Sequence, residues 1–217
     1  MHNYEHFLLY NNDRTDKELY IEIDGSGASI ITNEIIHNGQ FTLEESICSE
    51  SELRFGGCES SKVQFKINNI FPSLKDRWIT VKQIIDGNEE DPVQIGVFKI
   101  YSDKLTADRK HKDIVAYDRM YDIVNTDITE WYNGIVFPIQ IGELRNLLFE
   151  KLGVTQQDTV LINDLSAVDK TDYNGKVAAG DLLKDICELN ACFGKMNRYS
   201  FIRIASRKVL RKSSFAP

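Results

Sequence analysis

FTLEESICSESELRFGGCESSKVQFKI, residues 41–67, contains the pattern that decides the fold. Apolar and polar residues alternate in a run at each of its ends. The apolar positions on one side are Phe41, Leu43 and Ile47 in the first run and Val63, Phe65 and Ile67 in the second. A period of two is typical of a β-strand with one buried face. Gly56 and Gly57 lie between the runs, and paired glycines permit a tight bend or bulge between strands. The stretch therefore predicts two strands joined through a bend.

The rest of the first half also has the pattern of a β-structure. Strands are predicted at residues 19–23, 28–32, 78–85, 93–101 and 114–117. Turn-rich stretches at residues 24–27 and 86–88 separate some of them, and Pro92 follows the second. Short strands at regular spacing favour a sandwich or barrel. We expect a mostly antiparallel β-barrel domain over residues 19–126, preceded by an N-terminal arm over residues 1–18.

The pattern changes to a helical one near Asp127. Leucines recur at helical spacing over residues 139–152, with Gly153 at the C-terminal end, and again over residues 179–193, with Gly194 beyond. Short strands are predicted at residues 159–162 and 199–204. We therefore expect a small α+β domain with two helices over residues 127–205 and a basic C-terminal tail over residues 206–217, so that the fold class is α+β.

Composition points to a folded protein outside the membrane. The chain has 217 residues, of which 42% are hydrophobic and 27% charged, as in ordinary soluble proteins. It contains no apolar run of about 18 residues, so we expect no transmembrane anchor, and its N-terminus lacks the pattern of a secretory signal peptide. Four scattered cysteines do not predict a disulfide framework. Cys48 and Cys58 bracket the bend, whereas Cys187 and Cys192 fall on different faces of the predicted helix; we expect all four to be reduced apolar fillers.

Charge is distributed unevenly along the chain. From Arg198 onward there are six basic residues and no acidic ones, whereas the preceding 197 residues carry 20 basic and 33 acidic side chains, a formal charge of −13. An acidic body disfavours nonspecific binding to nucleic acid, and a basic tail is suited either to an acidic partner or to simple solvation.

No set of residues predicts catalysis, a cofactor or a metal. The four histidines, His2, His6, His37 and His111, lie in the N-terminal arm or in polar surroundings expected to be loops, without a metal-ligand or nucleophile motif. The stretch from Gly25 to Gly27 suits a hairpin turn better than a phosphate loop. The acidic pairs and clusters, Glu44–Glu45 in a strand and Glu89–Asp91 in a loop, lack calcium-loop spacing. Aromatic residues near a strand start and near the domain junction are expected to be packing residues, namely Trp78, Trp131, Tyr132, Phe137 and Phe149.

The opening segment resembles the phage and prophage tail hub family, the tail-tip proteins related to baseplate hubs. The residues that carry this resemblance are Leu43, Ser46, Ile47, Cys48, Leu53, Phe55, Gly56, Gly57, Cys58 and Phe65. Later segments are similar to the family in order and spacing: residues 77–87, 95–100, 114–121, 127–153 and 181–194. Together they cover about residues 20–205, and it is their order, rather than any single motif, that carries the resemblance.

The resemblance implies a structural role without enzymatic activity. Hubs of this family form a ring, usually a trimer whose subunits each supply two similar barrels, that joins the tail tube to the spike or fibre. We therefore expect self-association as a trimer, with a hexamer as the alternative, contacts with tube and spike or fibre proteins, and passage of DNA without specific binding. The expected location is the virion tail, with the host cytoplasm during assembly. After Ile204 little sequence remains for a second barrel, so we expect either a fragment of a longer hub or a ring built differently.

Two other functions remain open from the sequence. The chain is alternatively the N-terminal anchoring part of a tail-associated peptidase or lysin whose catalytic domain lies beyond Pro217, which the adjoining reading frame would reveal. It is also compatible with the hub of a bacterial contractile injection apparatus, which neighbouring sheath and ATPase genes would favour.

Overall fold

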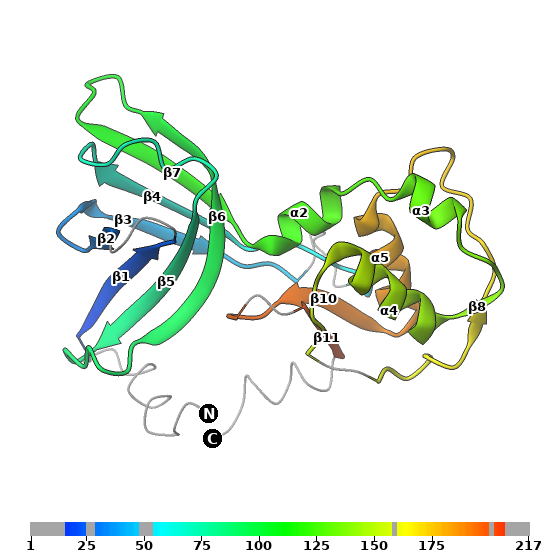
Figure 1. Ribbon diagram of the computed structural model, residues 1–217. Helices are drawn as coiled ribbons and strands as arrows, with labels where there is room; N and C mark the ends of the chain where they lie inside the picture. The colour runs from blue at the N-terminus through cyan, green and yellow to red at the C-terminus, as the bar shows by residue number, and fades with distance from the viewer. Residues whose placement is uncertain (1–15, 25–28, 48–53, 158–159, 200–201, 207–217) are drawn as a thin grey trace. The chain divides into compact units, whose positions relative to one another are not determined.

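The computed structural model describes residues 16–24, 29–47, 54–157, 160–199 and 202–206, and its chain forms two compact units (Figure 1). Unit 1 consists of the chain up to Glu44 and of Lys62–Tyr117. Unit 2 consists of Glu45–Ser61 and of the chain from Asp118 onward. The chain thus leaves unit 1 after one strand, contributes a segment to unit 2, and returns to the next strand.

Unit 1 is an antiparallel sheet of seven strands. Its strands are β1 (Lys17–Ile23), β2 (Ser29–Thr32), β3 (Ile36–Glu44), β4 (Lys62–Asn68), β5 (Trp78–Ile85), β6 (Val93–Leu105) and β7 (His111–Tyr117). They lie in the order β2-β1-β5-β6-β7-β4-β3, and the sheet curls into a nearly closed barrel (Figure 1). The two edge strands, β2 and β3, are consecutive in sequence, and Ile35 N donates to Thr32 O (3.0 Å) in the turn between them. The predicted N-terminal barrel is confirmed.

The barrel core comes from the alternation seen in the sequence. The fully buried side chains on its inner face are Ile21, Ile31, Val63, Ile67, Ile79, Val81, Ile100 and Ala116. Val63 lies opposite Ala116 and Ile21 opposite Val81, so that buried residues of neighbouring strands pack directly across the sheet. Each buried Val or Ile side chain of this set stabilises the fold by about 1.5–3 kcal/mol relative to its exposed state.

The opening stretch follows its predicted pattern only in part. β3 and β4 pair with each other, with Phe41 opposite Phe65 and the two rings 6.0 Å apart. However, Leu43 is 36% exposed, and Ile47 lies beyond the end of β3 and is 37% exposed. The alternation therefore predicts both strands correctly, but Leu43 and Ile47 are not part of the buried face that it predicts.

Unit 2 contains four helices and two small strand pairs within its described residues. Its elements are α2 (Arg119–Asn125), α3 (Thr129–Asn133), β8 (Ile139–Gln140), α4 (Ile141–Leu152), β9 (Ala167–Val168), α5 (Ala179–Leu189), β10 (Cys192–Met196) and β11 (Ile202–Ser206). β8 pairs with β9 and β10 with β11, both antiparallel. The α+β class is confirmed, and α2 and α3 are additional to the two predicted helices. Among these residues, no helix is long and apolar enough to cross a membrane.

Three local predictions in unit 2 are wrong. Residues 160–162 are not a strand, and the short strand of this region is β9. The second helix ends at Leu189 rather than Phe193, because Asn190 caps it and the chain then enters β10. Gly194 consequently lies within β10 and not beyond a helix end. By contrast, Gly153 ends α4 in the left-handed conformation, with φ of 60°, as its position predicted.

Residues 54–57, in the described part of the segment Glu45–Ser61, run beside β10 rather than forming a tight turn between β3 and β4. Gly56 N donates to Cys192 O (3.0 Å), and Gly194 N donates to Gly57 O (2.9 Å). Gly56 has φ of +91°, and a Cβ there would lie 3.1 Å from Lys184 O of α5. The glycine pair therefore allows the backbone to bend and to approach α5 and β10 closely.

Asp118 connects the end of the segment Glu45–Ser61 to α2 through hydrogen bonds. Its Oδ2 accepts a hydrogen bond from Ser61 N (2.9 Å), and its Oδ1 accepts one from Met120 N (3.0 Å) at the start of α2. The side chain is buried, and burial raises the pKa of Asp118 to about 6 although both hydrogen bonds favour the carboxylate. Asp118 thus caps α2 and fixes the end of the inserted segment with one carboxylate.

Candidate functional site

Three of the four cysteines meet in the core of unit 2. Cys58 Sγ lies 3.8 Å from Cys187 Sγ, and Cys192 Sγ donates to Cys187 O (3.2 Å). The prediction that Cys187 and Cys192 fall on different faces of one helix is wrong, because the helix ends at Leu189 and Cys192 lies in β10. Contacts with the thiols of Cys192 and Cys58, and then burial, raise the pKa of Cys187. All three are free, buried thiols, and the raised pKa of Cys187 disfavours the thiolate form that a nucleophile needs. Cys48 lies outside the described residues.

Two of the histidines do not lie in the loops where the sequence placed them. His37 is in β3 and His111 in β7, both in strands rather than loops, and their ring centroids are 4.2 Å apart. His111 Nδ1 also lies 3.6 Å from Asp108 Oδ2. Within the described part of the chain, no three His, Cys, Asp or Glu side chains are grouped so as to hold a metal ion. His2, His6 and the turn from Gly25 to Gly27 lie outside that part.

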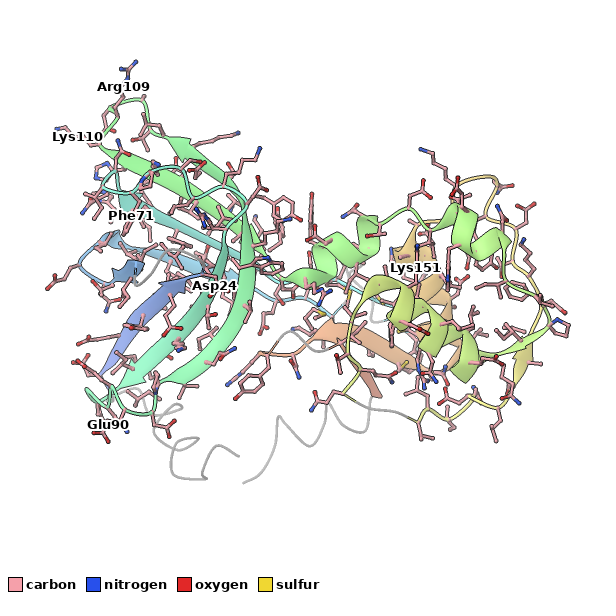
Figure 2. All side chains as sticks on the ribbon, viewed as in Figure 1. Asp24, Phe71, Glu90, Arg109, Lys110 and Lys151 are labelled. Carbon is pink, nitrogen blue, oxygen red and sulfur yellow. The ribbon has the colours of Figure 1, made fainter. Side chains whose placement is uncertain are left out.

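The acidic clusters are surface features of separate loops and strands. β3 ends at Glu44, whose carboxylate is 3.5 Å from Lys62 Nζ, while Glu45 is already in unit 2 and is 3.4 Å from Lys195 Nζ. The prediction that both lie in one strand is therefore wrong. The loop at residues 89–91 is exposed between β5 and β6, where Figure 2 shows Glu90 pointing outward.

Two of the aromatic residues line a cavity that the sequence did not predict. Tyr132 and Phe149 are buried core residues, and Trp131 and Phe137 pack against the same cluster, in agreement with a packing role. Tyr132 and Phe137 additionally face a cavity of about 450 Å³ in unit 2. The other residues that line it are Ile141, Leu144, Val168, Asp169, Thr171, Tyr173, Leu182, Asp185, Ile186, Glu188 and Leu189.

Tyrosine rings and carboxylates form the polar part of this cavity. The ring centroid of Tyr132 lies 5.5 Å from that of Phe137 and 5.4 Å from that of Tyr173, both at edge-to-face angles. The hydroxyl of Tyr173 donates a short hydrogen bond to Asp185 Oδ2. Burial, followed by that hydrogen bond and the charge of Asp185, raises the pKa of Tyr173. The hydroxyl consequently remains a donor, which fixes both side chains.

A second surface feature of unit 2 is the exposed apolar loop, defined here as residues 160–165. Val160, Ile162 and Leu165 are 81%, 84% and 84% exposed. Large aliphatic side chains gathered in one short loop at such exposure are typical of interaction surfaces rather than of scattered surface residues. Val160 and Ile162 fall in the strand predicted at residues 159–162, so the sequence did not indicate that they form a surface with Leu165.

The exposed apolar loop is held in place by a buried charge. Asp164 forms a bidentate ion pair with Arg145 of α4, whose side chain is 1% exposed, and Asp164 Oδ2 also accepts from Leu161 N (2.7 Å). Arg145 Nε donates to Gln156 Oε1 (3.1 Å). Asn163 N donates to Asn190 Oδ1 (2.9 Å). Because both its backbone and its only carboxylate are bound to the helical core, the loop presents its apolar side chains in a fixed arrangement.

The fold is similar to that of phage-type tail proteins of known structure. One is a 43 kDa tail protein of prophage MuSo2 from Shewanella oneidensis, with a TM-score of 0.58 and 12% identity over 88% of this chain and 56% of that one. Another is a tail protein from Neisseria meningitidis MC58, with a TM-score of 0.54 and 9% identity over 87% of this chain and 50% of that one. This chain therefore spans about half the length of these structures. No protein-family model and no curated protein matches the sequence.

Proposed function

We propose that this chain is a structural component of a phage or prophage tail, without enzymatic activity. The observation that carries the proposal is the fold: a barrel followed by an α+β unit, similar to two tail proteins over nearly nine tenths of the chain. Its place is the virion tail, after assembly in the host cytoplasm. The order of the motifs in the sequence, which resembles that of tail hubs, supports the same assignment.

Within the tail, the proposed role is that of a hub at the tip. Copies of the chain associate into a ring, a trimer in the favoured arrangement and a hexamer in the alternative one, that joins the tail tube to the spike or fibre. The formal charge of −13 over the first 197 residues supports passage of DNA without adhesion, because like charges repel.

The exposed apolar loop supports assembly with another protein. Burial of an aliphatic side chain contributes about 1.5–3 kcal/mol, so three such side chains in a fixed loop offer a substantial driving force for association. Since Arg145 and Asp164 already hold the loop, little conformational entropy is lost when it meets a partner. We propose that this loop lies in the contact between neighbouring copies.

The first experiment is the solution mass of the purified chain, measured by light scattering over a concentration series. A discrete trimer or hexamer is expected, and a monomer at all concentrations would overturn the self-assembled ring. The variant Ile162→Glu is expected to weaken the oligomer, because it places a charge among the apolar side chains. Val136→Glu is the matched control, because Val136 is equally exposed, at 84%, but belongs to a different loop.

The tail assignment itself is tested separately, by mass spectrometry of purified tail particles from the lysogen or phage that encodes the chain. The chain is expected in the particles at a fixed ratio to the tube protein. Its absence from complete tails would contradict a structural role in the tail, whatever its mass in solution.

A further inference from the structure

The cavity beside Tyr173 has a chemical character of its own. Its base is aliphatic, with Ile141, Leu144, Leu182 and Ile186 from α4 and α5. It is also lined by the ring of Tyr132 and by those of Phe137 and Tyr173, each of which packs on Tyr132. Its volume of about 450 Å³ lies in the range of clefts that hold small ligands or side chains.

The charged side chains that line the cavity are all acidic. Asp169, Asp185 and Glu188 line it, and among the described residues no lysine, arginine or histidine does. Asp185 is oriented by the hydroxyl of Tyr173, and the carboxylates come from two separate parts of unit 2, the stretch after β9 and the helix α5. A cavity with an apolar base, aromatic walls and three carboxylates is complementary to a group that combines an apolar stem with a positive tip.

Tyr132 already contacts such a group within the protein. The Nζ of Lys170 lies over its ring, 5.6 Å from the centroid, and donates to Asn133 Oδ1 (3.0 Å). Lys170 lines the neighbouring, smaller cavity and not this one. An aromatic ring attracts a cation through its quadrupole, and nearby carboxylates add to that attraction. The side chains of this region thus suit an ammonium or guanidinium group.

We propose that this cavity is a binding site for a lysine or arginine side chain of a partner protein. The aliphatic stem of the bound side chain lies against the α4–α5 base, and its charged tip lies among Asp169, Asp185 and Glu188. The apolar residues that flank such a side chain pack on Leu189, which is 48% exposed at the rim. The site is independent of the ring contact proposed above, because its recognition is cationic rather than apolar.

The probe for this proposal is a pair of short peptides that differ in one charge. Acetyl-Leu-Lys-Leu amide presents an ammonium group on an apolar stem, and acetyl-Leu-norleucine-Leu amide presents the same stem without the charge. Binding to the full chain is followed by NMR, through the shifts of amides in α5 and in residues 169–173. The lysine peptide is expected to bind at least fivefold more tightly than the norleucine peptide, and equal affinities would overturn the proposal.

Substitutions of single carboxylates then test whether the ammonium group of the peptide binds in the cavity. Glu188→Gln and Asp169→Asn alter exposed side chains and are expected to weaken the lysine peptide about two- to fivefold each, the effect of losing one partly exposed ion pair. Neither change is expected to affect the norleucine peptide. Glu150→Gln is the control, because Glu150 is an exposed carboxylate of α4 that does not line the cavity. If the control weakens binding as much as the two cavity variants, the peptide responds only to overall charge and the proposal fails.

Discussion

Replacement of Gly194 by alanine tests whether the segment Glu45–Ser61 is part of the core of unit 2. A Cβ at this position would lie 2.8 Å from Cys58 Sγ and 3.5 Å from Cys187 Sγ. The first distance is about 1 Å shorter than an ordinary carbon–sulfur contact, and Cys58 is buried, so the sulfur has little room to move. Overpacking of this kind costs typically 1–3 kcal/mol, which is the loss of unfolding free energy we expect.

The assay is native-state hydrogen exchange, because it reports the two units separately. Gly194→Ala is expected to speed exchange of the α5 and β10 amides while the β5–β6 amides of unit 1 keep their rates. Gly134→Ala is a matched control, because Gly134 has φ of −80° and a Cβ there meets its nearest atom at an ordinary 3.4 Å. That control is expected to change exchange little in either unit.

A double-mutant cycle identifies the sulfur as the cause. Cys58→Ala alone is expected to destabilise unit 2 by about 1–2 kcal/mol, because it removes a buried atom. In the double variant the new methyl group occupies the space that the sulfur vacated, so the combined loss should be smaller than the sum by about 1–2 kcal/mol. Strict additivity would show that Cys58 does not pack on Gly194 and would refute the place assigned to the segment.

Three other changes probe the charged groups inside each unit. The pKa of Asp118 is about 6 in the folded state, above its ordinary value of 3.8. Its protonation therefore stabilises the fold fully below about pH 4, and that stabilisation is lost as the pH rises through 6. In urea titrations, the unfolding free energy of the wild type minus that of Asp118→Asn should fall by up to about 3 kcal/mol over this pH window. Arg145→Met leaves Asp164 without its buried partner and should lower the unfolding free energy by about 3–5 kcal/mol, measured by urea denaturation. The double variant Arg145→Met/Asp164→Asn should recover part of this loss. Lys112→Met removes hydrogen bonds to two loop carbonyls (3.0 and 2.9 Å) and an ion pair with Asp103 (3.7 Å), and should cost about 1–3 kcal/mol, with faster amide exchange at residues 69–77; unchanged exchange there would contradict a role in holding that loop.

The sequence predicts the barrel well because its information is local. A strand with one buried face carries its own signature, and β5 begins and ends at residues 78–85 as predicted, although its alternation shifts between Val81 and Lys82. The helix α4 is similarly predicted by the spacing of its leucines and by Gly153 at its end. By contrast, α2 is only seven residues long with two buried side chains, which is too short to show a period, although Asp118 is a suitable N-cap signal.

The errors arise where distant parts of the chain meet. Gly194 has the expected character of a residue after a helix, but its role is to leave space for Cys58, which is far away in sequence. Residues 160–162 have the composition of a buried strand, but the ion pair between Arg145 and Asp164 and the backbone hydrogen bonds of Leu161 and Asn163 fix them as a loop. The sequence did not predict the cavity either, because its aromatic and acidic residues come from separate parts of the chain, namely α3, α5 and the stretches between them.

The path of the chain through the two units also limits how a gene for such a protein can be recombined. The backbone passes from one unit to the other at three peptide bonds, after Glu44, Ser61 and Tyr117. A single crossover near residue 118 would give a hybrid whose new unit 2 lacks its own segment 45–61 and faces a foreign one at β10 and α5. Exchange of the unit as a module requires two coordinated replacements, so that the short insertion and the long C-terminal part are inherited together.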